Sequence, residues 1–150
     1  MNDIDRLATV LPSLSSLVDR LWHGQLEHPV PNGGTVHQTL DRIIVMGTTY
    51  ACWLRGRPAT DCTAPMVYGW VPAAEFREVM DDLLAALGEP GMAEATLHTP
   101  MGTMTGAEVA HVILVGIVIN GRALATATDR PFDVPPAVMA AVDPFAATGV

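Results

Sequence analysis

Residues 105–128, TGAEVAHVILVGIVINGRALATAT, decide the fold. The centre of this stretch, Val112 to Ile119, is rich in β-branched residues and by itself fits a buried strand as well as a helix. Length favours a helix, because the apolar pattern continues from Ala107 to Ala127 with Gly121 as its one turn signal. A helix that is apolar on all sides is buried, which predicts contacts with the rest of the chain and with a second subunit.

Three further long helical patterns and one short pattern surround this stretch. The first has apolar residues three and four apart from Ile4 to Leu21, and Pro12 marks either its start or a kink. The second runs from Thr35, which suits an N-cap, to about Leu54. The third spans Pro72 to Leu87, and a short C-terminal helix is expected from about Pro136 to Val142.

The segments between these patterns contain helix breakers. HPVPNGG at residues 28–34 ends any helix, residues 55–70 form a long connection, and residues 92–104 are expected to form a second loop. A chain of 150 residues fits one domain. The sequence therefore predicts an all-α fold, in which residues 1–150 form a single four-helix bundle with a short extra C-terminal helix.

Charge and composition exclude several classes of protein. The formal net charge is -8 and the eight basic residues are scattered arginines, which argues against nucleic-acid binding. The apolar run VILVGIVI is too short to cross a bilayer. Cys52 and Cys62 lie ten positions apart with no signal peptide ahead of them, so reduced thiols in a soluble cytoplasmic protein are expected. A disulfide between them is the less favoured alternative.

Three segments in order resemble one family. PVPNGGTV at residues 29–36, TPMGTMTGAEV at residues 99–109 and NGRALATATDRPFDVPP at residues 120–136 are similar to segments of the DinB-like superfamily. The branch they resemble is named for mycothiol-dependent maleylpyruvate isomerase. The second segment resembles the stretch before that branch's fourth helix. Together with the helix order, the resemblance covers nearly the whole chain and implies a DinB-like helical bundle.

The resemblance also implies a metal site, and this chain departs from it. The family holds a divalent metal with a His on the second helix and a pair of ligands four residues apart on the fourth. Residues four apart share one face of a helix, which explains that spacing. In register, Arg42, Gly116 and Asn120 occupy the three ligand positions. These side chains cannot hold a transition metal, so we expect neither a metal nor another cofactor.

Several residues near the former metal position could still contact a ligand. Arg42 could bind a carboxylate or enolate, although such arginines are more often at the surface or paired structurally. Asn120 could donate to a ligand carbonyl or, more commonly, bond a neighbouring helix. Gly116 leaves room either for close helix packing or for a ligand. Met46 and Tyr50 could line a pocket and equally belong to an ordinary core.

His111 is the remaining candidate for chemistry. It could act as a general base, although a histidine in a core or an interface is the commoner case. Trp53 is most simply a core aromatic residue, with a pocket wall as the alternative.

Two functions follow as expectations. The first is a small-molecule-binding protein, with a pocket at the former metal site and Arg42 and Asn120 as polar anchors. It could be a metal-independent isomerase, cyclase or transferase-type tailoring enzyme, because stabilising an oxyanion requires only preorganised donors. The second is a non-catalytic binding or interaction module. A homodimer is expected in either case, with no nucleic-acid or membrane partner.

Overall fold

The computed structural model describes residues 2–57, 62 and 72–148, with side chains for all of these except residues 72 and 143–148. The chain is mostly helical, as the sequence predicts. Its elements follow the order α1 (Asp3–Asp19), η1 (His23–Gln25), α2 (Val36–Leu54), α3 (Pro72–Leu87), η3 (Met92–Glu94), β1 (Thr96–Thr99), β2 (Gly102–Thr105), α4 (Gly106–Thr128) and α5 (Pro136–Thr148).

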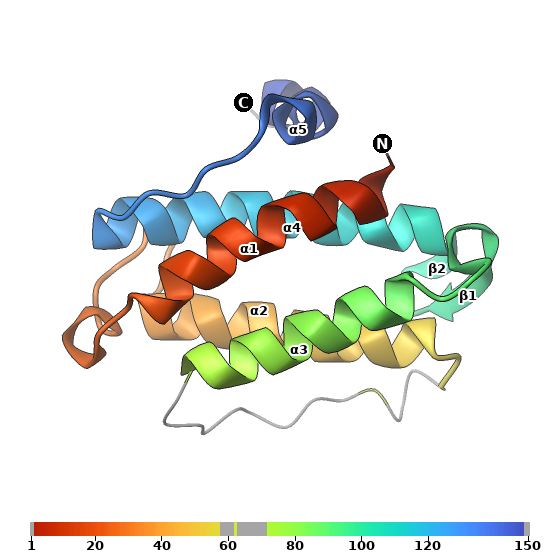
Figure 1. Cartoon of the computed structure of the whole chain (residues 1–150), viewed down its shortest axis with the longest axis horizontal. Coiled ribbons are helices and arrows are strands. Elements are labelled where there is room, and N and C mark those ends of the chain that lie inside the picture. Colours follow the sequence, from red (N-terminus) through yellow and green to blue (C-terminus); the bar gives the residue numbers. More distant parts are fainter. Residues whose placement is uncertain (1, 58–61, 63–71, 149–150) are drawn as a thin grey trace.

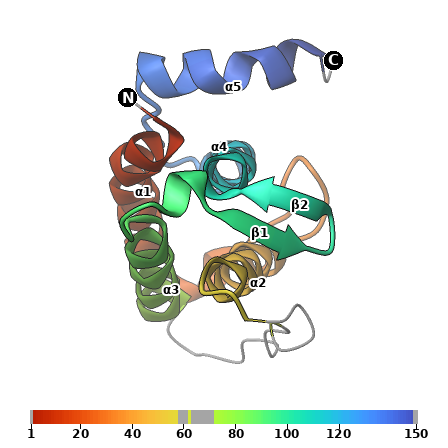
Figure 2. The same cartoon turned by 90° about the vertical axis from the view of Figure 1, so that its right-hand side faces the viewer.

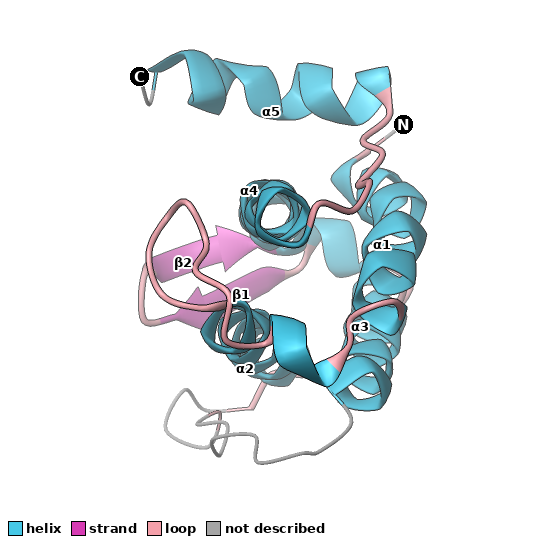
Figure 3. Ribbon diagram, turned by 90° about the vertical axis from the view of Figure 1, so that its left-hand side faces the viewer, coloured by secondary structure: helices cyan, strands magenta, loops and turns pink. Residues whose placement is uncertain are grey.

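The four long helices, α1 to α4, run side by side along the longest axis of the molecule (Figure 1). Viewed end-on, α1 and α3 form one side, while α4 and α2 lie beside them and the β1–β2 hairpin lies between α4 and α2 (Figure 2). The view from the opposite end shows α5 crossing the other helices rather than running along them (Figure 3). The hairpin therefore lies where α2 ends and α4 begins.

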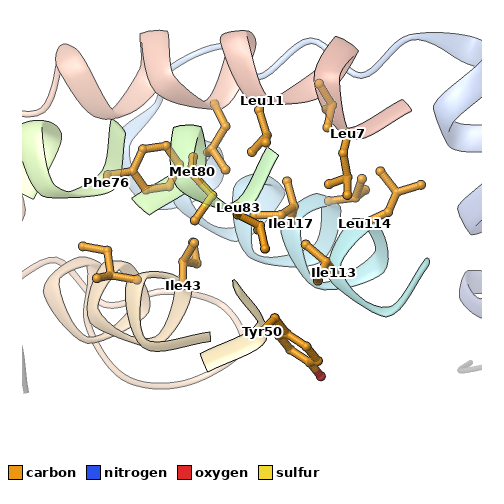
Figure 4. Packing of buried hydrophobic residues seen from close by; sticks show 14 of the residues in the cluster. Leu7, Leu11, Ile43, Tyr50, Phe76, Met80, Leu83, Ile113, Leu114 and Ile117 are labelled. Carbon is orange, nitrogen blue, oxygen red and sulfur yellow. The ribbon is translucent and has the colours of Figure 1, made fainter. Parts of the chain in front are cut away.

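One apolar core joins all four long helices. Phe76, Met80 and Leu83 of α3 are buried opposite Ile43 of α2 (Figure 4). Figure 4 also shows Leu7 and Leu11 of α1 beside Ile113, Leu114 and Ile117 of α4, all fully or almost fully buried. Burying a side chain of this size contributes about 1.5–3 kcal/mol, so the helical stripes read from the sequence supply the main driving force for this arrangement.

Helix α4 begins where the sequence predicts. The Thr105 hydroxyl accepts a hydrogen bond from the Glu108 backbone N–H at 3.1 Å, and the Glu108 carboxylate accepts one from the Thr105 N–H at 3.1 Å. This capping box satisfies two of the N–H groups at the helix start. The central residues Val112 to Ile119 are helical, so the strand alternative is excluded.

Helix α4 is also long and apolar enough, by length and composition, to cross a membrane. The eight-residue run VILVGIVI, on which the sequence prediction rested, is shorter than the apolar part of this helix. Half of its most apolar window is buried inside the structure. That is the pattern of a helix in the core of a folded domain, and it carries little weight as a sign of a membrane.

Helix α1 starts well before Pro12. Asn2 and Asp5 form a capping box, and the helix then continues through Pro12 to Asp19. Pro12 lies on the exposed side, where water can satisfy the carbonyl group that loses its helical partner.

The segment at residues 92–104 is not a plain loop, which corrects the sequence prediction. Strands β1 and β2 pair antiparallel, from Thr96 opposite Thr105 to Thr99 opposite Gly102. The Thr99 hydroxyl accepts from the Met101 N–H at 3.2 Å and donates to the Gly102 carbonyl at 2.9 Å, which closes the turn. Gly102 has φ +111°, a conformation that glycine adopts without strain. Leu97 anchors the hairpin because its side chain is buried in the core.

The C-terminal helix is longer than predicted. Helix α5 extends from Pro136 to Thr148 instead of ending near Val142. Val138 and Val142 are buried, whereas Ala137 and Ala140 are exposed. The helical sequence PAVMAAVDPFAAT contains a proline, Pro144, and the helix continues past it.

Candidate functional site

Helices α2 and α4 face each other at Met46 and Gly116, near the three residues Arg42, Gly116 and Asn120 that the sequence resemblance aligns with metal ligands. A Cβ atom built on Gly116 would lie 3.4 Å from the sulfur atom of Met46 and 3.9 Å from its methyl carbon. The thioether of Met46 therefore packs against Gly116 at a distance that just leaves room for a Cβ atom. Of the two interpretations of Gly116, close helix packing and room for a ligand, the structure supports close packing.

Arg42 lies at the surface rather than in the interior position that an anion-binding role at this site requires. Its guanidinium group extends toward Gly34, in the turn before α2: a Cβ atom built on Gly34 would lie 3.7 Å from the Arg42 Nη2 atom. The neighbouring Asp41 carboxylate lies 3.5 Å from the ring of His37 instead. Water competes for an arginine in this position, so Arg42 is a weak anchor for a buried ligand.

The amide group of Asn120 is already used within its own helix. The Asn120 Nδ2 atom donates to the Gly116 carbonyl at 2.8 Å, one turn earlier. The hydrogen bond is made along α4 rather than to a neighbouring helix. Among the described residues, no group of three or more His, Cys, Asp or Glu side chains is placed to hold a metal ion.

His111 joins the first turn of α1 to α4. Its Nδ1 atom lies 2.9 Å from one carboxylate oxygen of Asp3, and the other oxygen of Asp3 accepts from Arg6 at 2.8 Å. The His111 side chain is 28% exposed and that of Asp3 is 18% exposed. A carboxylate shared between an arginine and a histidine fixes the relative position of the two helices, which is a structural role.

Tyr50 and Trp53 form an aromatic pair near the end of α2. Their ring centroids lie 4.9 Å apart and their planes are nearly perpendicular, at 84°. Burial raises the pKa of the Tyr50 phenol above its usual value of 10.0, so the group stays neutral. Its hydroxyl oxygen points away from the labelled core residues (Figure 4). This geometry holds the Trp53 indole in place at the edge of the core.

Trp53 lines a pocket between the end of α2 and the β1–β2 hairpin. The pocket has a volume of about 520 Å³, within the range of sites that take small organic molecules. Its walls come from both elements: Trp53, Gly56, Arg57, Thr96, Leu97, His98, Thr99 and Pro100. Trp53 and the buried Leu97 give an apolar floor, whereas Arg57 and His98 are exposed at the rim.

The end of α2 positions Arg57 at this pocket. Gly56 has φ +75°, and its N–H donates to the Trp53 carbonyl at 2.9 Å. The Arg57 N–H donates to the Cys52 carbonyl at 3.3 Å. These two bonds form the helix-ending motif in which glycine takes the left-handed conformation. They place Arg57 directly after the turn, beside Trp53.

The side of β1 that faces away from β2 forms the other wall. Consecutive strand residues point to opposite faces of a sheet. All of residues 96–100 line the pocket, so it runs along the free edge of β1 rather than over one face. A free edge leaves alternate backbone N–H and C=O groups without a strand partner. The pocket thus has backbone as well as side-chain hydrogen-bonding groups within reach.

Cys52 and Cys62 form a disulfide, with Cα atoms 5.5 Å apart. This overturns the expectation of reduced thiols. Spacing alone could not decide the matter, because ten residues can either bring two cysteines together or hold them apart. Cys52 immediately precedes Trp53, and the Cys62 Sγ atom lies 3.9 Å from the Arg57 carbonyl oxygen. The disulfide therefore braces the turn that carries Arg57.

Sequence reasoning missed most of this pocket. It named Trp53 as a residue that could line one, but Arg57 and the hairpin residues had no role. The signal available was the pattern TLHTPMGTMT at residues 96–105, which has threonines on both sides of a Pro-Met turn followed by glycine. Most of the connection at residues 55–70 lies outside the described residues.

Comparisons of the chain with protein-family models, with curated proteins and with solved structures find no match. The resemblance to the DinB-like superfamily therefore rests on the three sequence segments and on the order of the helices.

Proposed function

We propose that this chain is a small-molecule-binding helical protein whose ligand occupies the pocket between the end of α2 and the β1–β2 hairpin. The observation that carries the proposal is the pocket itself, which combines about 520 Å³ of space with an apolar floor and a polar rim. The proposal moves the ligand away from the former metal position, where Met46 packs against Gly116.

Binding, rather than catalysis, is the activity that this lining favours. Its polar side chains are Arg57, His98 and the two threonines, and the Thr99 hydroxyl is engaged in the hairpin turn. The eight lining residues within the described part of the chain include no cysteine, serine or carboxylate beside a base, which nucleophilic or general acid–base catalysis commonly uses.

A nuclear magnetic resonance screen with a collection of small fragments tests the location. Fragments that bind should shift the indole signal of Trp53 and the methyl signals of Leu97. Thr96→Trp, which fills the pocket from an exposed strand position, should abolish these shifts. Thr126→Trp is the matched control, because Thr126 is exposed on α4 and does not line the pocket. Shifts that cluster instead at Met46 and Gly116 would return the ligand to the former metal position.

We also propose that the four long helices form a DinB-like bundle that works without the family's metal. The packing of Met46 against Gly116 supports the alignment, since it brings α2 and α4 together near the three replaced ligand positions. Restoring the ligands tests it: Arg42→His, Gly116→Asp and Asn120→His together should give a chain that binds about one nickel or zinc ion. Titration calorimetry measures the metal binding, and the unaltered chain, which should bind none, is the control. A folded triple variant that binds no metal would refute the alignment.

A homodimer is the second candidate, and one surface favours it. Ile119 on α4 is 52% exposed, and Val115 and Val112 lie four and seven residues before it on the same side of the helix. A large apolar side chain in this position is suited to contact with another copy of the chain. This surface lies apart from the pocket residues, so the two functions are compatible.

A further inference from the structure

We propose that the pocket binds a small organic anion, with its charged group at Arg57 and its flat apolar part against Trp53 and Leu97. This inference rests on the proposed function, because it assigns a ligand class to the same pocket. It depends on three features of the described residues: a guanidinium group that forms no ion pair, a lining without acidic groups, and an aromatic floor held in a fixed orientation.

The first feature is that Arg57 makes no ion pair with a described carboxylate. Asp82 on α3 lies near this end of α2, but Arg55 already occupies both of its oxygens at 2.8 and 2.7 Å. Such a two-point pair leaves the carboxylate few free acceptor sites. Among the residues that the structure describes, no carboxylate forms an ion pair or hydrogen bond with Arg57, although hydrogen bonds from Arg55 and, to a lesser degree, the charge of Arg57 lower the pKa of the Asp82 carboxyl group. Its hydrogen-bond donors therefore remain available to a ligand.

The second feature is the distribution of charge. The chain carries sixteen acidic residues and a formal net charge of -8, yet none of the eight lining residues is acidic. The side-chain groups at the rim that can reach a ligand, on Arg57, His98 and Thr96, can all donate hydrogen bonds. Described lining residues that donate hydrogen bonds and include no acidic group, on an otherwise acidic protein, are complementary to an anion rather than to a cation.

The third feature is the floor. Trp53 is fixed by its perpendicular contact with Tyr50, and Leu97 is buried in the core. An indole and a leucine side chain at the base of a pocket favour a ring or another flat apolar group. The volume of about 520 Å³ accommodates such a group together with a carboxylate, sulfonate or phosphate.

A matched pair of fluorescent probes tests the charge requirement. The first probe is 1-anilinonaphthalene-8-sulfonate, a flat aromatic anion, and the second is N-phenyl-1-naphthylamine, which has the same rings without the sulfonate. The unaltered chain should bind the sulfonate at one molecule per chain and about fivefold to tenfold more tightly than the neutral probe, as expected for one partly exposed charged contact.

Substitutions then assign the site. Arg57→Gln should lower the affinity for the sulfonate by about fivefold to tenfold and leave that for the neutral probe unchanged. Arg122→Gln is the control, because Arg122 is also an exposed arginine but lies on α4 outside the pocket. Trp53→Ala should weaken the binding of both probes. Circular dichroism of each variant verifies that the helices are intact.

The outcomes separate this inference from the proposed function. If both probes bind equally and Arg57→Gln changes neither affinity, while Trp53→Ala or Thr96→Trp abolishes both, the pocket is a ligand site but the anion inference is refuted. If neither probe binds, or if Trp53→Ala and Thr96→Trp leave the affinity of the probes unchanged, both the proposed ligand site and the anion inference are refuted.

Discussion

The sulfur atom of Met46 on α2 packs against Gly116 on α4, at 3.4 Å from where a Cβ atom of residue 116 would lie. This contact brings together a residue of α2 and a residue of α4 that lie far apart in the sequence. Because a Cβ atom there would make an ordinary van der Waals contact with the sulfur, this packing does not by itself require a glycine in mid-helix, where glycine costs about 1 kcal/mol relative to alanine.

The first prediction concerns this contact. Met46→Ala should lower the free energy of unfolding by about 1–3 kcal/mol, toward the low end for a core truncation because Met46 is only partly buried. Gly116→Ala should be neutral or stabilising by up to about 1 kcal/mol, since its Cβ atom just fits against the sulfur. Urea unfolding monitored by circular dichroism measures both. A Met46→Ala variant as stable as the unaltered chain would show that the contact contributes nothing to folding.

The second prediction concerns the ion pair beside the pocket. Arg55→Gln should release Asp82, which can then pair with Arg57 and compete with an anionic probe. The affinity for the naphthalene sulfonate should therefore fall about twofold to fivefold, as for a surface ion pair worth under about 1 kcal/mol. Adding Asp82→Asn to Arg55→Gln should restore it. A loss of affinity that persists in the double variant would mean that Arg55 itself binds the probe.

The third prediction concerns the disulfide. Replacing both Cys52 and Cys62 by serine should lower the free energy of unfolding by about 2–3 kcal/mol if the cross-link acts by restricting the unfolded chain. Urea unfolding with and without a reducing agent gives the same comparison in the unaltered protein. Adding reducing agent to the double-serine variant is the control and should have no effect.

The disulfide also gives a test of location. Structural disulfides persist in oxidising compartments, whereas the cytoplasm expected from the sequence keeps most thiols reduced. Labelling free thiols in intact cells before lysis distinguishes the two: unlabelled Cys52 and Cys62 indicate an oxidising compartment, and labelled cysteines a reducing one.

The fourth prediction concerns self-association. If the surface at Ile119 joins two copies, light scattering should give twice the chain mass of 15.9 kDa at micromolar concentration. Ile119→Asp should shift the protein to the monomer, because it places a charge in an apolar contact. Ala107→Asp, at an exposed position near the start of α4, should leave the mass unchanged. A monomer in the unaltered chain would refute the dimer.

The fifth prediction concerns alkaline pH. Burial raises the pKa of Tyr50 in the folded chain, so the unfolded chain releases this proton first as the pH rises above 10.0. The folded state then binds more protons than the unfolded state, and stability falls with rising pH until the folded phenol also ionises. Tyr50→Phe should lose less stability than the unaltered chain between pH 9 and pH 11, roughly one unit either side of the ordinary value. If Tyr50→Phe and the unaltered chain lose equal stability over this pH range, ionisation of Tyr50 is not the cause of the loss.

The sequence by itself determined the helices. The apolar stripes of α1 to α4 and the capping residues Thr35 and Thr105 depend on neighbours within one or two turns, so spacing along the chain was sufficient to locate them. For the same reason it placed Gly116 and Asn120 on one face of α4. The hairpin was missed because four-residue strands carry too weak a local pattern when their stability comes from one buried anchor, Leu97.

Only the tertiary structure decided the candidate site. Which way Arg42 extends, whether Met46 fills the space at Gly116, and whether Cys52 meets Cys62 all depend on how elements distant in the chain approach each other. The pocket likewise joins Trp53 and Arg57 to residues some forty positions later, at the edge of a strand. Residue 105 caps the helix that decides the fold, but β1, the first strand of the hairpin that leads to it, forms one wall of the site. The start of the helix depends on interactions between residues close together in the sequence. The pocket wall depends on packing between segments that are far apart in the sequence.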